Sequence, residues 1–114
     1  MLARKNRLID SKDYKRVEEK GKVYQSQNFG LACYFREDLE PSRFGFIVST
    51  KIAKDSVDRN RFKRAMSESV RTSCTEIKPG YDAVFLAKTS IVRVPTSDVM
   101  KEVRVALKES GLLK

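Results

Sequence analysis

Residues 81–87 read Tyr81-Asp82-Ala83-Val84-Phe85-Leu86-Ala87 and follow the turn-forming pair Pro79-Gly80. A nearly continuous apolar run of this length predicts a strand that is buried on both faces. We therefore expect an α/β fold with this strand in its interior, and the sequence on either side supplies the other elements.

Two runs upstream place apolar side chains at every second position. In residues 29–35, every second side chain from Phe29 onward is apolar, and in residues 43–49 Phe44, Phe46 and Val48 share one side. This period of two predicts strands. A short polar connection joins the runs, and we expect them to form an antiparallel hairpin.

Three segments have helical patterns. Ser11 to Lys20 predicts a short helix, with Ser11 as its cap and Gly21 as a left-handed stop. A second helix is expected from an N-cap at Asp55 or Ser56, and a third from Thr96 to Gly111. Since 40% of the residues are hydrophobic, residues 1–114 suffice for one core, and we expect a single domain.

The middle helix has two chemically distinct sides. Phe62, Met66 and Val70 form a narrow apolar stripe that is expected to pack on the sheet. The outward side is predicted to carry Asn60, Arg61, Lys63, Arg64, Ser67 and Arg71. Arg59 lies in line with the stripe at the first turn, so its head is expected to reach past the helix start toward Lys51.

The composition excludes several classes of function. There is no histidine, which rules out Ser-His-Asp triads, Cys-His pairs and zinc sites with histidine ligands. Cys33 and Cys74 form no metal or redox motif and are interpreted as reduced thiols of a cytoplasmic protein. No run is long enough for a membrane span and no secretory signal is recognised, so no membrane partner is expected.

The net charge of +9 indicates a polyanion as partner. Its densest cluster is Arg59-Asn60-Arg61-Phe62-Lys63-Arg64. On a helix this cluster has a fixed orientation. It therefore favours a defined nucleic-acid-binding surface over a flexible basic tail.

This cluster, with Glu68 and Arg71, resembles the signature helix of bacterial ribonuclease P proteins, Arg-Asn-Arg-x-Lys-Arg-x-x-Arg-Glu-x-x-Arg. The similarity continues in order along nearly the whole chain, through Lys5-x-Arg7-Leu8, Asp13-Tyr14, Val17, Gly21, Arg43-x-Gly45, Val48-Ser49-x-Lys51, Gly80-Tyr81-Asp82, Leu86-Ala87 and Gly111-Leu112-Leu113-Lys114. The chain departs from the family pattern at Glu18, Thr50, Ala53 and Ser67.

The resemblance implies the fold of domain 2 of ribosomal protein S5. That fold is an α/β (α+β) sandwich with a sheet of about four strands, helices on one side, and a left-handed βαβ crossover. Handedness rules alone would predict the right-handed form.

The resemblance also implies the function of a protein subunit that binds a catalytic RNA and the 5′ leader of precursor tRNA, and so promotes endonucleolytic removal of the leader. Mg²⁺ is expected in the RNA; the chain itself is expected to hold no catalytic residue, metal or cofactor and to need no obligate protein partner. The residues expected to bind RNA are Arg7, Lys51, Arg59, Asn60, Arg61, Lys63, Arg64 and Arg71, with Tyr14 and Tyr34 lining a leader cleft between the sheet and the first helix.

Three other functions fit part of the sequence. Residues 43–47 superficially resemble the aromatic strand of an RNA-recognition motif, which would need Phe44 and Phe46 exposed. A ribosomal or assembly protein could bind RNA without any role in cleavage. A protein-only nuclease could use Asp55 with Asp58, or Asp82, although the first two have the spacing of helix-capping residues.

Overall fold

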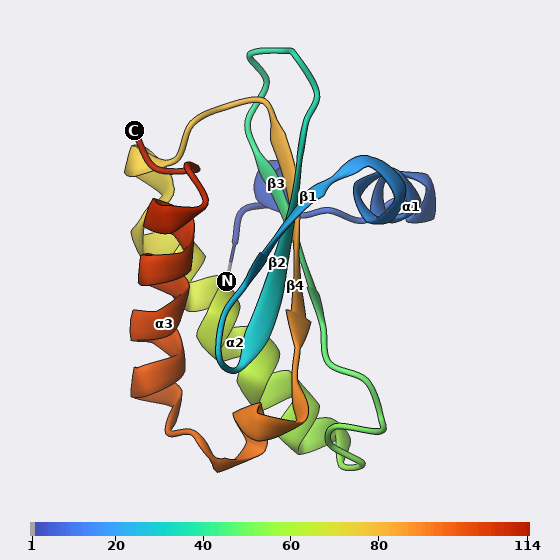
Figure 1. Cartoon of the computed structure of the whole chain (residues 1–114), viewed down its shortest axis with the longest axis vertical. Helices are drawn as coiled ribbons and strands as arrows, with labels where there is room; N and C mark the ends of the chain where they lie inside the picture. The colour runs from blue at the N-terminus through green and yellow to red at the C-terminus, as the bar shows by residue number, and fades with distance from the viewer. Residues whose placement is uncertain (1) are drawn as a thin grey trace.

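The computed structural model describes residues 2–114, which form a four-stranded sheet and three α-helices (Figure 1). The helices are α1 (Ser11–Lys20), α2 (Ser56–Thr72) and α3 (Thr96–Glu109), and the strands are β1 (Lys22–Gln25), β2 (Phe29–Phe35), β3 (Arg43–Ile47) and β4 (Tyr81–Ala87). Short 3-10 turns occupy Arg4–Asn6, Cys74–Glu76 and Thr89–Arg93. The mixed α/β class expected from the sequence is confirmed.

The strand order is β1-β2-β4-β3. The expected hairpin between residues 29–35 and 43–49 is therefore wrong, because β4 lies between β2 and β3 and pairs with both. β2 pairs with β4 antiparallel, and β3 pairs with β4 parallel. The partner of β2 in a hairpin is β1, a mostly exposed strand whose weak alternation escaped the sequence analysis.

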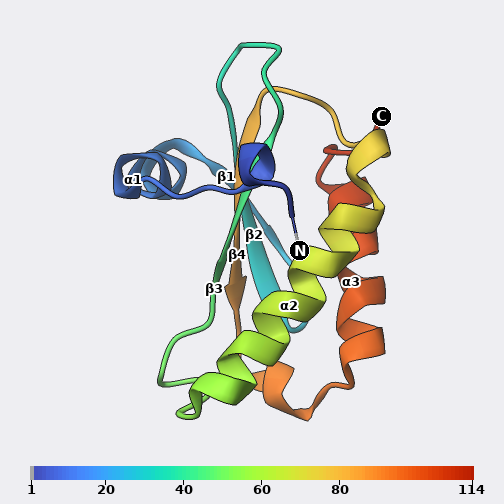
Figure 2. The same ribbon diagram turned by 180° about the vertical axis from the view of Figure 1, so that it is seen from behind.

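The connection from β3 to the parallel strand β4 runs through α2. In Figure 1, β3 lies behind β4, both strands run downward, and α2 returns upward on the left, while Figure 2 shows the same unit from behind. This arrangement makes the β3-α2-β4 crossover left-handed, as the family resemblance implies and against the general rule.

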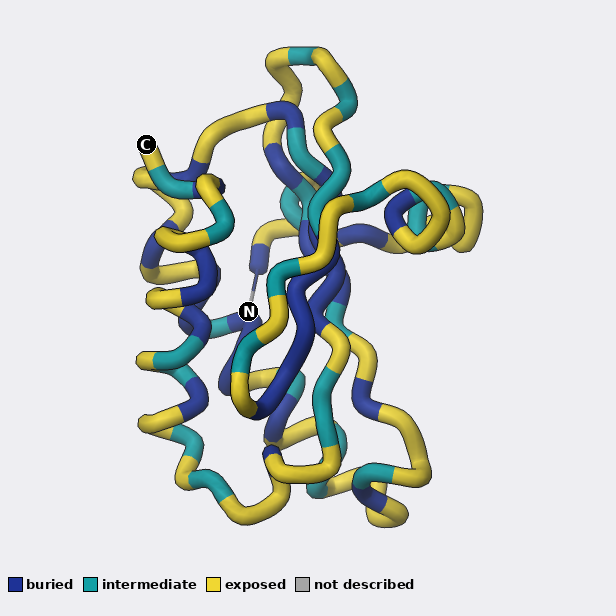
Figure 3. Tube along the Cα trace, viewed as in Figure 1, coloured by how far each residue is buried: buried dark blue, intermediate teal, exposed yellow. Residues whose placement is uncertain are grey.

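The sheet has helices on both faces. Apolar side chains of α2 and α3 pack against Phe29, Leu31 and Phe85 in the main core. On the opposite face, Val17 of α1 packs against Ala32 and Val84 in a smaller cluster. The expectation of helices on one side thus holds for α2 and α3 but is wrong for α1, which leaves part of its sheet face uncovered (Figures 1 and 3).

The ends of α1 differ from the sequence expectation. Asp10, and not Ser11, is the N-cap, since its carboxylate accepts a hydrogen bond from the backbone N–H of Lys12 at 3.0 Å. Gly21 ends the helix with extended backbone (φ −75°), so it is no left-handed stop. A glycine is required at this position for a steric reason, because the methyl group of an alanine would lie 3.0 Å from the carbonyl oxygen of Cys33.

The apolar stripe of α2 is confirmed, as Phe62, Met66 and Val70 are fully buried. Ser67, expected on the outward side, is buried as well, and its hydroxyl donates to the carbonyl of Arg64 at 3.1 Å. A serine can be enclosed here because its hydroxyl bonds within the helix. Among residues 2–114, no helix has the length and hydropathy to cross a membrane.

Candidate nucleic-acid interface

A pocket of about 460 Å³ opens along the outer edge of β3, between α2, α1 and the N-terminal segment; we call it the edge pocket. It brings together five residues that the sequence analysis selected. Its polar and aromatic lining is Arg7, Tyr14, Asn60, Lys63, Arg64 and Ser67, with Leu2, Leu8, Ile9, Phe44, Gly45 and Phe46 completing the wall. Among residues 2–114, three cations and no carboxylate line this pocket.

The N-terminal segment is held along β3, which positions Arg7. The backbone N–H of Leu8 donates to the carbonyl of Phe44 at 2.9 Å, and the Asn6 side-chain amide donates to the carbonyl of Ser42 at 3.0 Å. Leu8 itself is buried. Arg7 therefore reaches the pocket from a backbone segment that is held along β3.

The cations of the edge pocket are available for a ligand. Within residues 2–114, the side chains of Arg7, Lys63 and Arg64 make no ion pair and no hydrogen bond with the protein. Asn60 lies one helical turn before both Lys63 and Arg64 and adds an amide group. Free guanidinium and ammonium groups beside an amide suit phosphate oxygens.

Tyr14 of α1 forms one wall of the edge pocket. Its ring lies on Gly45 of β3, where only a glycine leaves room for it. Partial burial raises the pKa of the Tyr14 phenol above its usual value, so the hydroxyl stays protonated near neutral pH. Tyr14 also lines a second pocket on the α1 face of the sheet.

This second pocket, here called the apolar cleft, has a volume of about 300 Å³. Its lining is Tyr14, Val17, Glu18, Val23, Ala32, Ile47, Val84 and Leu86. Val23, Ile47 and Leu86 are among the exposed large hydrophobic residues of the molecule. Among the described residues, Glu18 is the only charged residue of the cleft, and it is one of the positions where the chain departs from the family pattern.

Tyr34 does not join Tyr14 in the apolar cleft. It lies on the same face of the sheet but farther along β2, opposite Asp82 of β4. The Arg16 guanidinium covers its ring, with 5.4 Å between Cζ and the ring centroid. One face of Tyr34 is thus occupied by the protein itself.

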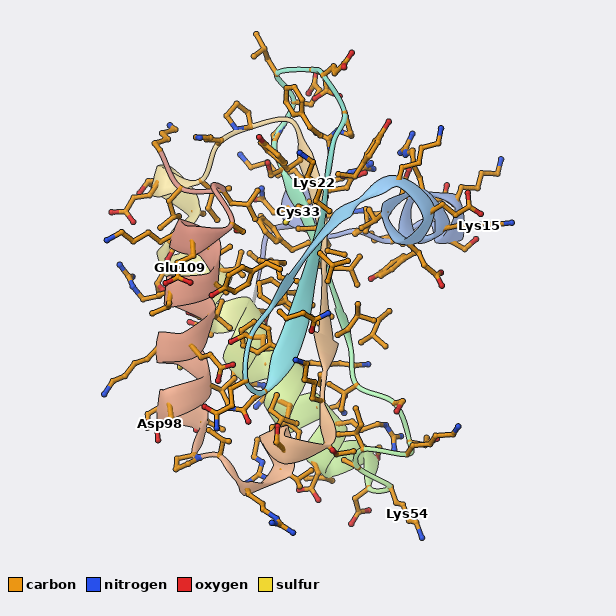
Figure 4. All side chains as sticks on the ribbon, in the orientation of Figure 1. Lys15, Lys22, Cys33, Lys54, Asp98 and Glu109 are labelled. Carbon is orange, nitrogen blue, oxygen red and sulfur yellow. The ribbon has the colours of Figure 1, made fainter. Side chains whose placement is uncertain are left out.

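The other basic residues selected from the sequence lie outside the edge pocket. The Arg59 guanidinium turns back toward the β3–α2 loop, as expected, and its Nη1 donates to the carbonyls of Ala53 at 2.9 Å and Lys54 at 2.6 Å. Lys51 is exposed in that loop, and Lys54 marks its outer end in Figure 4. Arg59 therefore fixes the loop that carries Lys51.

Arg61 and Arg71 are exposed on α2, each beside an acidic residue one turn earlier. Arg61 Nη2 lies 3.7 Å from the Asp58 carboxylate, and its guanidinium lies over the ring of Phe62. Arg71 Nε donates to Glu68 at 2.9 Å, and this hydrogen bond lowers the pKa of the Glu68 carboxyl. Arg61 also lines a groove between α2 and α3, together with Asn60, Arg64 and Met100.

A buried ion cluster that the sequence analysis missed fixes α1 on the sheet. The fully buried Asp82 carboxylate accepts from Arg43 Nε at 2.9 Å and Nη2 at 2.8 Å, and also from Arg36. Arg43 Nη1 reaches Asp13 of α1 at 3.1 Å, and Arg16 bonds the same carboxylate. The feature of the sequence that could have indicated this cluster is Asp82, a charged residue inside the apolar run of β4.

The structure contradicts the RNA-recognition-motif alternative. Phe44 is only 2% exposed, and Phe46 stacks on Phe85 with 5.4 Å between ring centroids, so these rings belong to the core and not to an RNA-recognition surface. Asp82 is enclosed by arginines. In the described part of the chain, no three acidic or cysteine side chains gather as metal ligands would.

A family model described as Ribonuclease P matches residues 2–111. The chain belongs to the ribonuclease P protein family. Members of this family are protein components of an endoribonuclease, and this chain shares that function.

Two curated relatives named ribonuclease P protein component show the extent of the similarity. The protein from Dehalococcoides mccartyi strain 195 is 37% identical over 108 residues, which cover 95% of this chain and 87% of the relative. The protein from Syntrophomonas wolfei is 35% identical over 112 residues, covering 98% and 92%. The match thus spans the edge pocket, the apolar cleft and α2 together.

Solved ribonuclease P proteins have the same fold. The Staphylococcus aureus protein superposes with a TM-score of 0.88 at 22% identity and covers 96% of this chain and 98% of its own. The Thermotoga maritima protein, solved with 1-(4-fluorophenyl)-2-thiourea, superposes with a TM-score of 0.81 at 26% identity, covering 90% and 97%.

Proposed function

We propose that the chain binds the catalytic RNA of a bacterial ribonuclease P and the 5′ leader of precursor tRNA, and thereby promotes cleavage of the leader in the cytoplasm. The observation that supports this function most directly is the edge pocket, where cations from two separated segments converge without internal partners. It meets the apolar cleft at Tyr14.

The two pockets suit the two parts of a single-stranded nucleotide chain. Aromatic and aliphatic walls accept bases by stacking and burial, and such contacts tolerate any base. Cations accept the phosphates, and the arginine forks can do so with two parallel hydrogen bonds. We infer a leader cleft formed by α1 and the open part of the sheet, with Tyr14 as its aromatic wall; Tyr34 lies outside this cleft, farther along β2.

The protein contributes charge and position, and the RNA contributes the reacting metal ions. Mg²⁺ held by the catalytic RNA would supply the hydrolytic chemistry, as the resemblance to the family implies. By neutralising phosphates of both RNAs, the basic residues of α2, Arg7 and Lys51 reduce the repulsion between two polyanions. Contact with roughly five phosphates corresponds to a slope of about −3.5 to −4.5 in a plot of log affinity against log salt.

The test is cleavage of a precursor tRNA at low Mg²⁺, with and without a bacterial catalytic RNA. We expect the chain to accelerate cleavage only when that RNA is present, and an Arg61→Ala/Arg64→Ala variant to lose the acceleration. Lys108→Ala, which removes an exposed charge of α3, is the control. Cleavage by the chain alone would place the reaction in the protein, and RNA binding without any effect on cleavage would favour a structural RNA-binding protein.

A further inference from the structure

We propose that, in the absence of RNA, the loop between β2 and β3 of one copy of this chain docks into the edge pocket of a second copy. Leu39 then lies against the apolar wall of the pocket, and the carboxylates of Glu37 and Glu40 lie against its cations. This inference goes beyond the proposed function, because it concerns a contact between two copies of the protein and not the binding of RNA.

The loop, residues 36–42, carries an apolar and acidic tip on a basic protein. It projects beyond the end of the sheet in Figure 1, and Leu39 is 89% exposed. Glu37 and Glu40 are exposed on either side of Leu39. Within residues 2–114, their carboxylates make no ion pair and no hydrogen bond. Two unpaired carboxylates repel a polyanion, so this tip suits a cationic partner with an apolar surface.

Arg36 holds the loop in a fixed conformation. Its side chain is largely buried beneath the loop, and its Nη2 donates to the carbonyls of Glu40 at 3.2 Å and Pro41 at 2.9 Å. Its Nε donates to the Asp38 carboxylate at 3.0 Å. Glu37 has a φ of +64°, in the left-handed region that residues other than glycine rarely adopt. A loop that is fixed in this way loses little conformational entropy when it binds.

The edge pocket has the properties that complement this tip. Three cations without internal partners stand beside an apolar wall that includes Ile9, which is itself 65% exposed. The apolar cleft contains Glu18 and the groove between α2 and α3 contains Glu68, so each of those linings opposes an acidic tip. Of these three hollows, the edge pocket is therefore the one that matches the tip in both charge and apolar surface.

The positions of the loop and the pocket favour a reciprocal contact. The loop leads directly into β3, and the edge pocket opens along the outer edge of the same strand. The tip points beyond the sheet and is held there by Arg36, so it does not fill the pocket of its own chain. Two copies placed in opposite directions along this edge bring the loop of each to the pocket of the other, which gives a closed pair. At about 0.15 M salt, charges farther apart than about 8 Å are screened, so the net charge of +9 does not prevent close contacts between opposite charges.

The experiment measures the average molar mass of the RNA-free chain against its concentration, by sedimentation equilibrium at about 0.15 M salt. Three double variants reverse two charges each, in the tip, in the pocket and at exposed control sites, and they are Glu37→Lys/Glu40→Lys, Lys63→Glu/Arg64→Glu and Glu19→Lys/Asp98→Lys. The control variant changes the net charge by the same amount as the tip variant. Circular dichroism verifies that each variant is folded.

We expect the wild type and the control variant to form pairs with a dissociation constant on the order of 100 μM, as a small interface implies. The tip variant and the pocket variant should each pair at least about tenfold more weakly, because like charges then face each other. An equimolar mixture of these two variants should restore pairing, since each tip then meets a pocket of opposite charge. A wild-type chain that stays monomeric at about 1 mM, or a mixture that does not pair, would overturn the inference.

A single-stranded RNA oligonucleotide tests whether the contact uses the edge pocket. An oligonucleotide that binds the chain should return the pairs to monomers, because both need the same cations. Pairs that persist with the oligonucleotide bound would place the contact elsewhere and overturn the inference. If the oligonucleotide does not bind at all, the proposed function fails, while the masses measured without RNA still decide whether the pair exists.

Discussion

The ring of Tyr14 lies against the backbone of Gly45. A methyl group on Gly45 would lie 2.5 Å from Cε1 and 2.6 Å from Cζ of that ring, closer than any side chain tolerates. The glycine thus lets a helix on one side of the sheet place an aromatic ring on the edge strand. The wall between the edge pocket and the apolar cleft depends on this contact.

Gly45→Ala is expected to displace Tyr14 and to lower the free energy of unfolding by about 1–3 kcal/mol, the usual effect of overpacking. Adding Tyr14→Ala should relieve part of this loss, so the two changes will be non-additive in denaturant unfolding. Gly30→Ala is the control, because its methyl group would meet only the end of Gln25 at 3.4 Å. If the changes in unfolding free energy caused by Tyr14→Ala and Gly45→Ala add fully, the contact between the two residues contributes nothing to stability.

Asp82→Asn is expected to lower the free energy of unfolding by about 3 kcal/mol or more, because it leaves buried guanidinium groups without their counter-charge. Urea unfolding measures the change. Asp38→Asn is the matched control, since the Asp38 carboxylate is exposed and its replacement should cost far less. Equal losses of unfolding free energy for the two substitutions would show that burial of the Asp82 cluster adds nothing to its contribution to stability.

Asp13→Asn is expected to weaken binding of a leader-containing precursor tRNA, although it removes a negative charge from a polyanion-binding protein. The reason is that Asp13 ties α1 to Arg43 on the sheet and so positions Tyr14. Glu19→Gln removes the same charge from an exposed site of α1 and should leave binding equal or slightly stronger. Tighter binding by Asp13→Asn would show that its charge, and not its contact, governs affinity.

Arg59→Ala is expected to speed amide hydrogen exchange in residues 50–55, because the substitution removes the hydrogen bonds to the carbonyls of Ala53 and Lys54. Exchange in the second half of α2 should not change. Arg61→Ala, which removes an equal charge without touching the loop, is the control. Unchanged exchange in the loop would contradict the positioning role of Arg59.

Stability should fall at alkaline pH. Burial raises the pKa of the Cys33 thiol to about 12, from an ordinary value of 9.0. The unfolded thiol ionises first, so the contribution of Cys33 is complete below pH 9 and is lost between pH 9 and about pH 12. Urea unfolding on either side of pH 9 should show a smaller decline for Cys33→Ala than for wild type, whereas Cys74→Ala, at an exposed site, should behave as wild type.

Local patterns in the sequence predicted most elements with accurate limits. The strand bounds 29–35 and 81–87 and the start and end of α1 agree with the structure, and the buried stripes of α2 and α3 are those expected from their periodicity. β1 escaped because its residues are mostly exposed and only two of them are apolar. Asp10 was passed over as the α1 cap in favour of the neighbouring Ser11.

The sequence by itself determined the class of the fold, the basic helix and the family, because period, composition and motif order are local properties that a single chain carries. Only the tertiary structure decided that β4 lies between β2 and β3, that α1 covers the face opposite α2 and α3, and that Arg7, Tyr14 and Lys63 line one pocket. An alternating pattern indicates which side of a strand is buried, but it does not indicate which strand or helix lies beside that strand. That choice depends on burying the whole core at once and on satisfying Asp82 with arginines that are distant in the sequence.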